Sequence, residues 1–107
     1  MRFIDNLYVT DKTEHKIKSI KRKLKLGIGM VSVNVITIAS NDSDVFDIIP
    51  AAMFKSYKLR HSDLLVIGFA ESKKAALSLV ERIIKEHFEL TGTYMNLRRD
   101  FLEMMVK

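Results

Sequence analysis

The chain has 107 residues, of which 48% are hydrophobic and 29% are charged, and its net charge is +5. This balance is typical of a globular protein with one core and excludes a disordered chain. The absence of cysteine excludes disulfides, thiolate metal sites and cysteine nucleophiles, and the apolar runs are far shorter than a membrane span. We therefore expect a single soluble domain over residues 1–107, located in the cytoplasm and without a membrane partner.

The N-terminal quarter of the chain predicts a strand followed by a helix. Residues 2–9 mix aromatic, β-branched and polar side chains, which favours an irregular strand at a sheet edge. Asp11 has a glutamate, Glu14, three positions further on, which is the pattern of a capping box. Apolar residues at helical spacing then continue to Leu24, and Gly27 is placed to end the helix.

The next segment predicts a strand, and the element that follows it has two possible assignments. Residues 30–39 are β-branched almost throughout and become apolar on both faces, which predicts a central strand. Beyond a polar turn, Asp47 and Pro50 are typical of a helix start and predict a helix to about Tyr57. The alternation in residues 45–49 (Val45 to Ile49) also allows a short edge strand, with a helix that begins at Pro50.

The C-terminal half completes the predicted fold. Residues 64–69 form a continuous apolar run, which indicates a strand covered on both faces. Ser72 is placed to cap a long amphipathic helix, and helical spacing resumes after Gly92. The order β-α-β-α-β-α-α predicts an α/β domain with a three-stranded parallel or mixed sheet and helices packed on it.

The first predicted helix carries all of the excess charge. Between Asp11 and Leu26 there are seven basic and two acidic residues, a net +5 that equals the charge of the whole chain. An exposed ridge of this helix could follow a phosphate backbone, although lysines also simply keep an outer face solvated, and no aromatic residue is interleaved to stack bases. The predicted polyanion-binding residues are Lys18, Lys21, Arg22 and Lys25.

Acidic residues follow the predicted strands. If the strands are parallel, their carboxyl ends meet at one edge of the sheet, where ligands of α/β domains bind. Carboxylates gathered there could hold Mg²⁺ for metal-assisted or phosphate-handling chemistry, although the same residues are common helix caps. The predicted metal-binding residues are Asp11, Asp42, Asp44 and Glu71.

Other sequence features do not indicate an enzyme. Gly27 and Gly29 lie between a helix and a strand, which is the reverse of a phosphate-binding loop, and are interpreted as a cap and a turn. Gly68 is interpreted as a position of close backbone approach. His61 with Asp63 is the one pair that suggests acid–base work, but no serine stands in a nucleophile elbow.

The C-terminal segment predicts self-association. A narrow sheet leaves unpaired edges, and the last predicted helix has more apolar surface than a small domain needs. The predicted interface residues of a homodimer are Tyr94, Leu97, Phe101, Met104 and Met105. The leading hypothesis is therefore a non-catalytic, homo-oligomeric interaction module without a cofactor, and nucleic-acid or other polyanion binding and a Mg²⁺-dependent enzyme are the alternatives.

Overall fold

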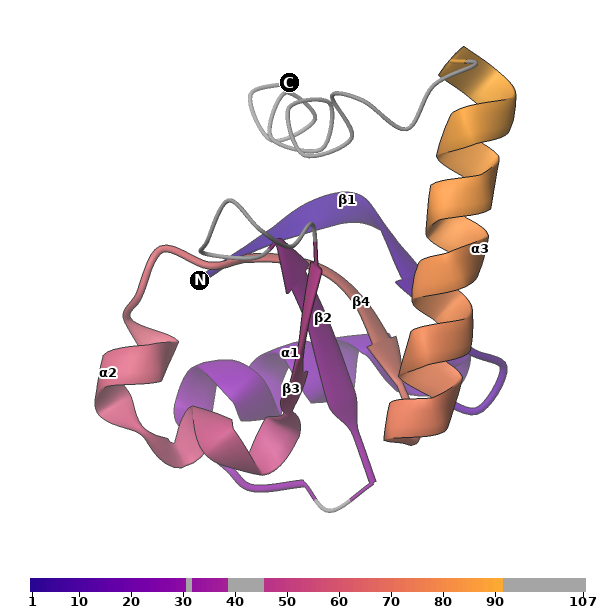
Figure 1. The fold of residues 1–107 in the computed structure, drawn as a ribbon. Helices are drawn as coiled ribbons and strands as arrows, with labels where there is room; N and C mark the ends of the chain where they lie inside the picture. Colours follow the sequence, from indigo (N-terminus) through magenta and orange to yellow (C-terminus); the bar gives the residue numbers. More distant parts are fainter. Residues whose placement is uncertain (31, 39–45, 92–107) are drawn as a thin grey trace.

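The computed structural model describes residues 1–30, 32–38 and 46–91, and over these ranges it shows a four-stranded mixed sheet with helices (Figure 1). The last predicted helix, after Gly92, lies outside the described residues. In chain order the elements, including two short 3₁₀ helices (η), are β1 (Arg2–Val9), η1 (Glu14–Lys16), α1 (Ile17–Leu26), β2 (Asn34–Ile38), β3 (Phe46–Pro50), η2 (Ala51–Lys55), α2 (Tyr57–Arg60), β4 (Leu65–Ala70) and α3 (Lys73–Thr91).

The strand order of this sheet is β1-β4-β2-β3. β1 pairs with β4 in parallel, whereas β2 is antiparallel to both β4 and β3. The α/β class, the mixed sheet, the edge position of β1 and the central position of β2 are confirmed. The prediction of three strands is wrong, because β3 adds a fourth strand within the described ranges and changes the order of elements.

The strand β3 replaces the helix predicted from Asp47 to about Tyr57, so the edge-strand alternative is the correct one over Phe46–Pro50. Ile48 packs on one face of the sheet and Ile49 on the other, which the alternation of a strand allows. Pro50 is the last residue of this edge strand, where its missing N–H does little harm. Pairing along the whole of β2 therefore outweighs the local helix-start signals.

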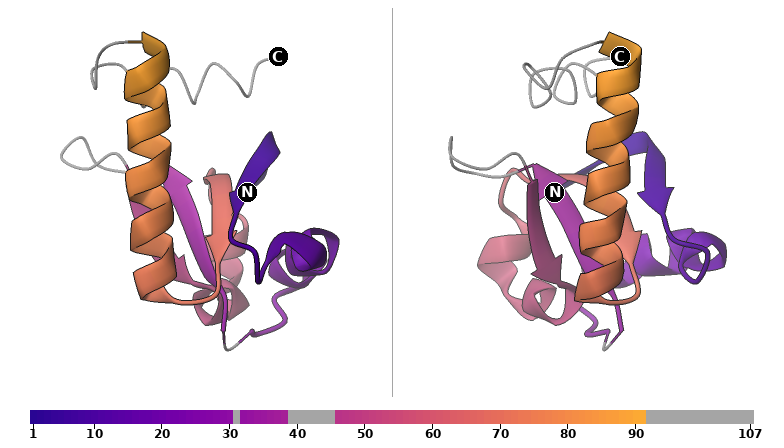
Figure 2. Two further views of the ribbon diagram at one scale, coloured as in Figure 1. Left: turned by 90° about the vertical axis from the view of Figure 1, so that its right-hand side faces the viewer. Right: turned by 45° about the vertical axis from the view of Figure 1, so that its right-hand side comes forward.

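The sheet is covered on both faces, which gives three layers (Figure 2). α3 packs on one face through its buried residues Ala76, Leu79 and Ile83. α1 and η2 pack on the opposite face, where the buried residues of the core are Ile20, Leu24, Val35, Ala51, Phe54, Val66 and Phe69. All of β4 is buried, as expected for a strand between two helical layers.

The two parallel strands are joined across an irregular register. Phe3 pairs with Val66, but the next pair is Tyr8 with Gly68, so the intervening residues of β1 bulge away from β4. A Cβ on Gly68 would overlap the backbone carbonyl oxygen of Tyr8. The irregular edge strand and the close approach at Gly68 are both confirmed.

The helix ends follow the predicted chemistry in two cases of three. Gly27 has a φ of 73° and ends α1 in a left-handed turn, with hydrogen bonds from its own N–H and that of Ile28. The Ser72 hydroxyl accepts the Ala75 N–H at 3.0 Å and caps α3. The capping box predicted for Asp11 is wrong, because the Glu14 N–H donates to the Thr10 carbonyl and Thr13, not Asp11, is the residue before the first helical turn.

Candidate polyanion-binding surface

The two helical layers have very different charges. Residues 11–29 and 51–61, which include α1, η2 and α2, hold ten basic and two acidic residues, a net +8; we call them the basic layer. Residues 71–91, which include α3, hold four basic and four acidic residues, a net charge of zero. The sequence places part of this excess on α1, but only the fold brings η2 and α2 to the same side of the sheet.

The predicted ridge of α1 faces outward. Ile20 and Leu24 are 2% and 0% exposed, so the helix presents its apolar stripe to the sheet. Lys18, Arg22 and Lys25 are exposed, and Lys21 is partly buried. Their placement is compatible with contacts to a chain of phosphates or sulfates.

Two lysines of the ridge lie over an aromatic ring of the neighbouring strand. The Nζ atoms of Lys21 and Lys25 are 5.3 and 5.5 Å from the centroid of the Phe3 ring, within the range of cation–π attraction. The Phe3 ring in turn meets Phe69 edge-on, with centroids 6.3 Å apart. This stack anchors one side of α1 to the sheet.

Arg60 joins α2 to the end of α1. Its Nη1 donates hydrogen bonds to the carbonyl oxygens of Phe54 at 3.0 Å and Lys55 at 2.6 Å. Its guanidinium packs so closely against Gly27 that a Cβ there would overlap it, and the Lys55 side chain is equally close to Gly29. The positive groups of α2 and η2 therefore continue the charged surface of α1, at a helix C-terminus where positive charge is favoured.

An aromatic pair borders this surface and was missed by the sequence analysis. The rings of Tyr57 and His61 have centroids 4.0 Å apart, and the residue Tyr57 is 70% exposed. The spacing of these residues, four positions apart, would have predicted the pairing if residues 57–60 had been assigned to a helix of their own.

The strand-end acids do not gather as predicted. The prediction required β2 to run parallel to its neighbours, but β2 is antiparallel to β4. The carboxyl end of β2 therefore lies at the opposite end of the strands from the carboxyl ends of β1 and β4. Asp42 and Asp44 lie outside the described residues. Among the described ranges, no group of three His, Asp or Glu residues is placed to hold a metal ion.

Glu71 has a structural partner at the edge where β1 and β4 end. The Thr10 hydroxyl donates a hydrogen bond to the Glu71 carboxylate, and the same threonine is linked through its N–H to the Thr13 hydroxyl at 3.0 Å. This bond from Thr10 is the main cause of a lowered pKa for Glu71, to which a backbone hydrogen bond and the charge of Lys12 contribute. Two shallow hollows, of about 520 and 460 Å³, border Glu71 and Ser72.

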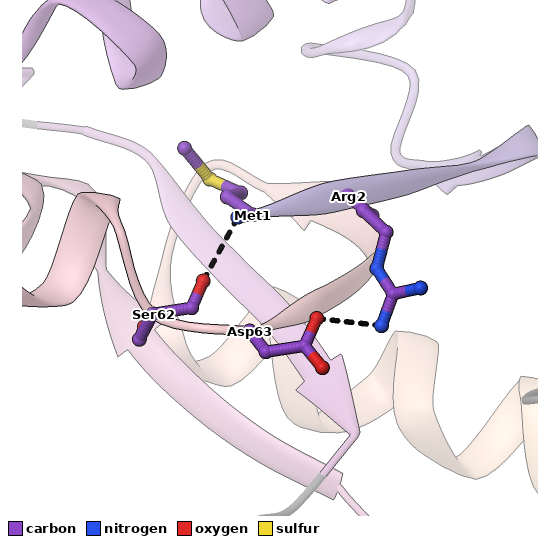
Figure 3. A network of polar contacts seen from close by, with 4 residues as sticks. All are labelled: Met1, Arg2, Ser62 and Asp63. Carbon is purple, nitrogen blue, oxygen red and sulfur yellow. Dashed lines mark hydrogen bonds and ion pairs between the residues drawn. The ribbon is translucent and has the colours of Figure 1, made fainter.

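His61 and Asp63, the two residues that suggested acid–base work, each contact a different partner. The Arg2 guanidinium lies 2.5 Å from the Asp63 carboxylate (Figure 3), while the His61 ring stacks on Tyr57. The N-terminal ammonium also donates to the Ser62 carbonyl at 2.8 Å, as Figure 3 shows. These contacts fix the start of β1 to the turn before β4 and give Asp63 a structural role.

The residues predicted to form a homodimer interface lie outside the described part of the chain, so Tyr94, Leu97, Phe101, Met104 and Met105 are not placed. No helix in the described part of the chain has the length and apolar character needed to cross a membrane. Comparisons with protein-family models, with curated proteins and with solved structures find no match for this chain.

Proposed function

We propose that this chain is a non-catalytic binding module that holds a polyanion on its basic layer. The observation that carries the proposal is the concentration of a net +8 on one side of the sheet, whereas residues 71–91 on the opposite side have no net charge. The lysines and arginines of this surface would displace the counterions condensed on the polyanion, which gives an affinity that falls steeply with salt.

The arrangement of the charges supports the same proposal. Like charges stand four positions apart at Lys18 and Arg22 and again at Lys21 and Lys25, and each such pair destabilises a helix by about 0.2–0.5 kcal/mol. Acids at some of these positions would give a more stable α1. Binding of an anionic partner is a physical reason to keep them basic.

Heparin retention tests the proposal with two matched variants. Arg22→Glu with Lys25→Glu reverses two charges of the basic layer, and Lys73→Glu with Lys85→Glu reverses two charges of the α3 layer. Both double variants have a net charge of +1 instead of +5. We expect the first to lose retention at about 50 mM salt and the second to elute close to the native protein, because binding depends on where the charges lie.

Two results would contradict polyanion binding. The native protein could fail to bind heparin at low salt, or the two double variants could lose retention to the same extent, which would show that only net charge matters. Circular dichroism and thermal unfolding of both variants verify that the fold is retained.

We also propose that the chain forms a homodimer through the outer face of α3. Leu77 and Phe88 are 49% and 39% exposed and are separated by about three turns, so they share one ridge with Ile84. Lys73 and Lys74 are at the beginning of α3, whereas Glu86 and Glu89 are near its end. In a two-fold dimer with antiparallel α3 helices, these opposite charges would meet and the apolar ridge would be covered.

Light scattering behind size-exclusion chromatography tests this dimer. We expect a dimer mass at both about 50 and about 500 mM salt, because apolar burial is insensitive to screening. Leu77→Asp should give a monomer, while Met53→Asp, an equally polar change at an exposed position of the basic layer, should not. A native monomer at about 100 μM protein (a Kd well above the range of a stable dimer) would contradict the proposal.

A further inference from the structure

The Tyr57 ring is exposed but held in place. Tyr57 begins α2 and is 70% exposed. His61, one turn further on, lies with its ring centroid 4.0 Å from that of Tyr57 and the two ring planes 34° apart. The Arg60 Cζ is 5.9 Å from the Tyr57 centroid. The ring is therefore supported by two neighbours while most of its surface faces solvent.

Arg60 connects this ring to the basic layer. The guanidinium that lies near Tyr57 also bonds to the carbonyl oxygens of Phe54 and Lys55 and packs against Gly27 at the end of α1. Residues 51–61 contain three basic residues and no acidic ones. Asp63, the next acid along the chain, is paired with Arg2. An anionic group beside the ring would meet positive charge without a nearby free carboxylate from this segment.

We propose that the polyanion is a single-stranded nucleic acid, one base of which stacks on Tyr57 while its phosphates contact the basic layer. The inference rests on the proposed function, because the same positive surface binds the backbone. Proteins that bind single strands combine a basic track with aromatic rings, since every base has a flat face. A base within a duplex is already stacked on both sides, so a duplex offers Tyr57 only its backbone.

An anionic lipid surface is the competing partner for a basic layer. Leu26, Ile28 and Met53 are also exposed there and could enter a lipid headgroup region. The geometry favours nucleic acid, because a flat ring fixed by a histidine and an arginine matches a flat ligand, whereas insertion into lipid has no need of a fixed ring orientation. Vesicles are therefore included in the experiment as a separate probe.

A tryptophan reporter tests the stacking directly. The chain contains no tryptophan, so the variant Tyr57→Trp has a single indole at the proposed site. The probes are 15-nucleotide DNA and RNA strands of the same sequence, the DNA duplex, heparin, and vesicles with and without phosphatidylserine. We expect quenching of the indole fluorescence by the single strands but not by heparin, with the difference between DNA and RNA reporting contacts to the 2′-hydroxyl.

Affinity measurements by fluorescence anisotropy complete the test. Tyr57→Ala should weaken binding of the single strand by roughly 5- to 150-fold, the range for one stacked base, and Tyr57→Phe should restore it. Heparin retention of Tyr57→Ala should stay close to that of the native protein. Arg22→Glu with Lys25→Glu should weaken both ligands, because it removes charge rather than the ring.

The outcomes separate this inference from the proposed function. Unchanged single-strand affinity of Tyr57→Ala, with heparin binding retained, would overturn the stacking inference and leave polyanion binding standing. Equal affinity for single strand and duplex would overturn it as well, and so would quenching by phosphatidylserine vesicles but not by strands. Failure of the native protein to bind any of these probes would overturn both.

Discussion

The two helical layers cover the same sheet and have equally buried inner faces, but their outer surfaces differ. The inner residues Leu24 on α1 and Ile83 on α3 are both fully buried. Outside, α3 places Arg82 3.8 Å from Glu86 one turn away, a stabilising spacing, whereas α1 places like charges at the same spacing. Folding therefore accounts for the inner faces of both layers, whereas the like charges of α1 do not stabilise the helix and are the basis of the proposed polyanion binding.

The largest expected effect would show that both layers are needed for the fold. Phe54→Ala on the basic layer should lower the free energy of unfolding by about 3–5 kcal/mol, and Ile83→Ala on the α3 layer by about 2–5 kcal/mol. Both side chains are fully buried, so each change leaves a cavity. Urea unfolding measures both. A cost below about 1 kcal/mol at Phe54 would mean that η2 is not part of the core.

The second effect concerns the connection between α1 and α2. Gly27→Ala places a Cβ at a φ of 73° and against the Arg60 guanidinium, which is fixed by two hydrogen bonds. We expect a loss of about 1–2 kcal/mol in the free energy of unfolding. Gly29→Ala is the control, because it meets only the flexible end of Lys55. Equal losses for the two variants would contradict the role given to Arg60.

A third effect compares the caps of the two layers. The Ser72 hydroxyl caps the 19-residue helix α3 at 3.0 Å, and the Ser56 hydroxyl caps the four-residue helix α2 at 3.4 Å. Ser72→Ala should lower the free energy of unfolding by about 1 kcal/mol, and Ser56→Ala by less, because its hydrogen bond is longer and the helix that it caps is shorter. Thermal unfolding at matched protein concentration gives the order, and a larger loss at Ser56 would reverse this comparison.

The smallest effect depends on pH. The hydrogen bond from Thr10 lowers the pKa of Glu71 in the folded state below its usual value of about 4.5. The resulting stabilisation is present above the unfolded-state pKa and is lost as the pH falls through the folded-state pKa. Thr10→Val should therefore lower the melting temperature more at pH 7 than at pH 3, and Thr10→Ser should not. A pH-independent difference between Thr10→Val and the native protein would assign the effect to packing alone.

Single residues show why the sites were harder to predict than the helices. The outward position of Arg22 follows from the spacing of Ile20 and Leu24, so it could be inferred without the fold. The position of Glu71 relative to the acids that follow β2 depended on strand direction, which local patterns do not encode. Because β2 is antiparallel to β4, the carboxyl ends of these two strands lie at opposite ends of the sheet. Tyr57 was assigned to the end of a longer helix, so its pairing with His61 was missed.

Local sequence patterns were sufficient to predict the α/β class, the strands β1, β2 and β4, the helices α1 and α3, and their caps at Gly27 and Ser72. These features depend on periodicity and on the conformational preferences of a few residues, which act over one or two turns. Three features are defined by tertiary structure alone: Phe46–Pro50 is a strand, β2 runs antiparallel, and α2 meets the C-terminal end of α1 through Arg60 and Gly27. The physical reason is that backbone pairing and burial between distant segments outweigh local preferences, and here they also assemble the surface that we propose binds the ligand.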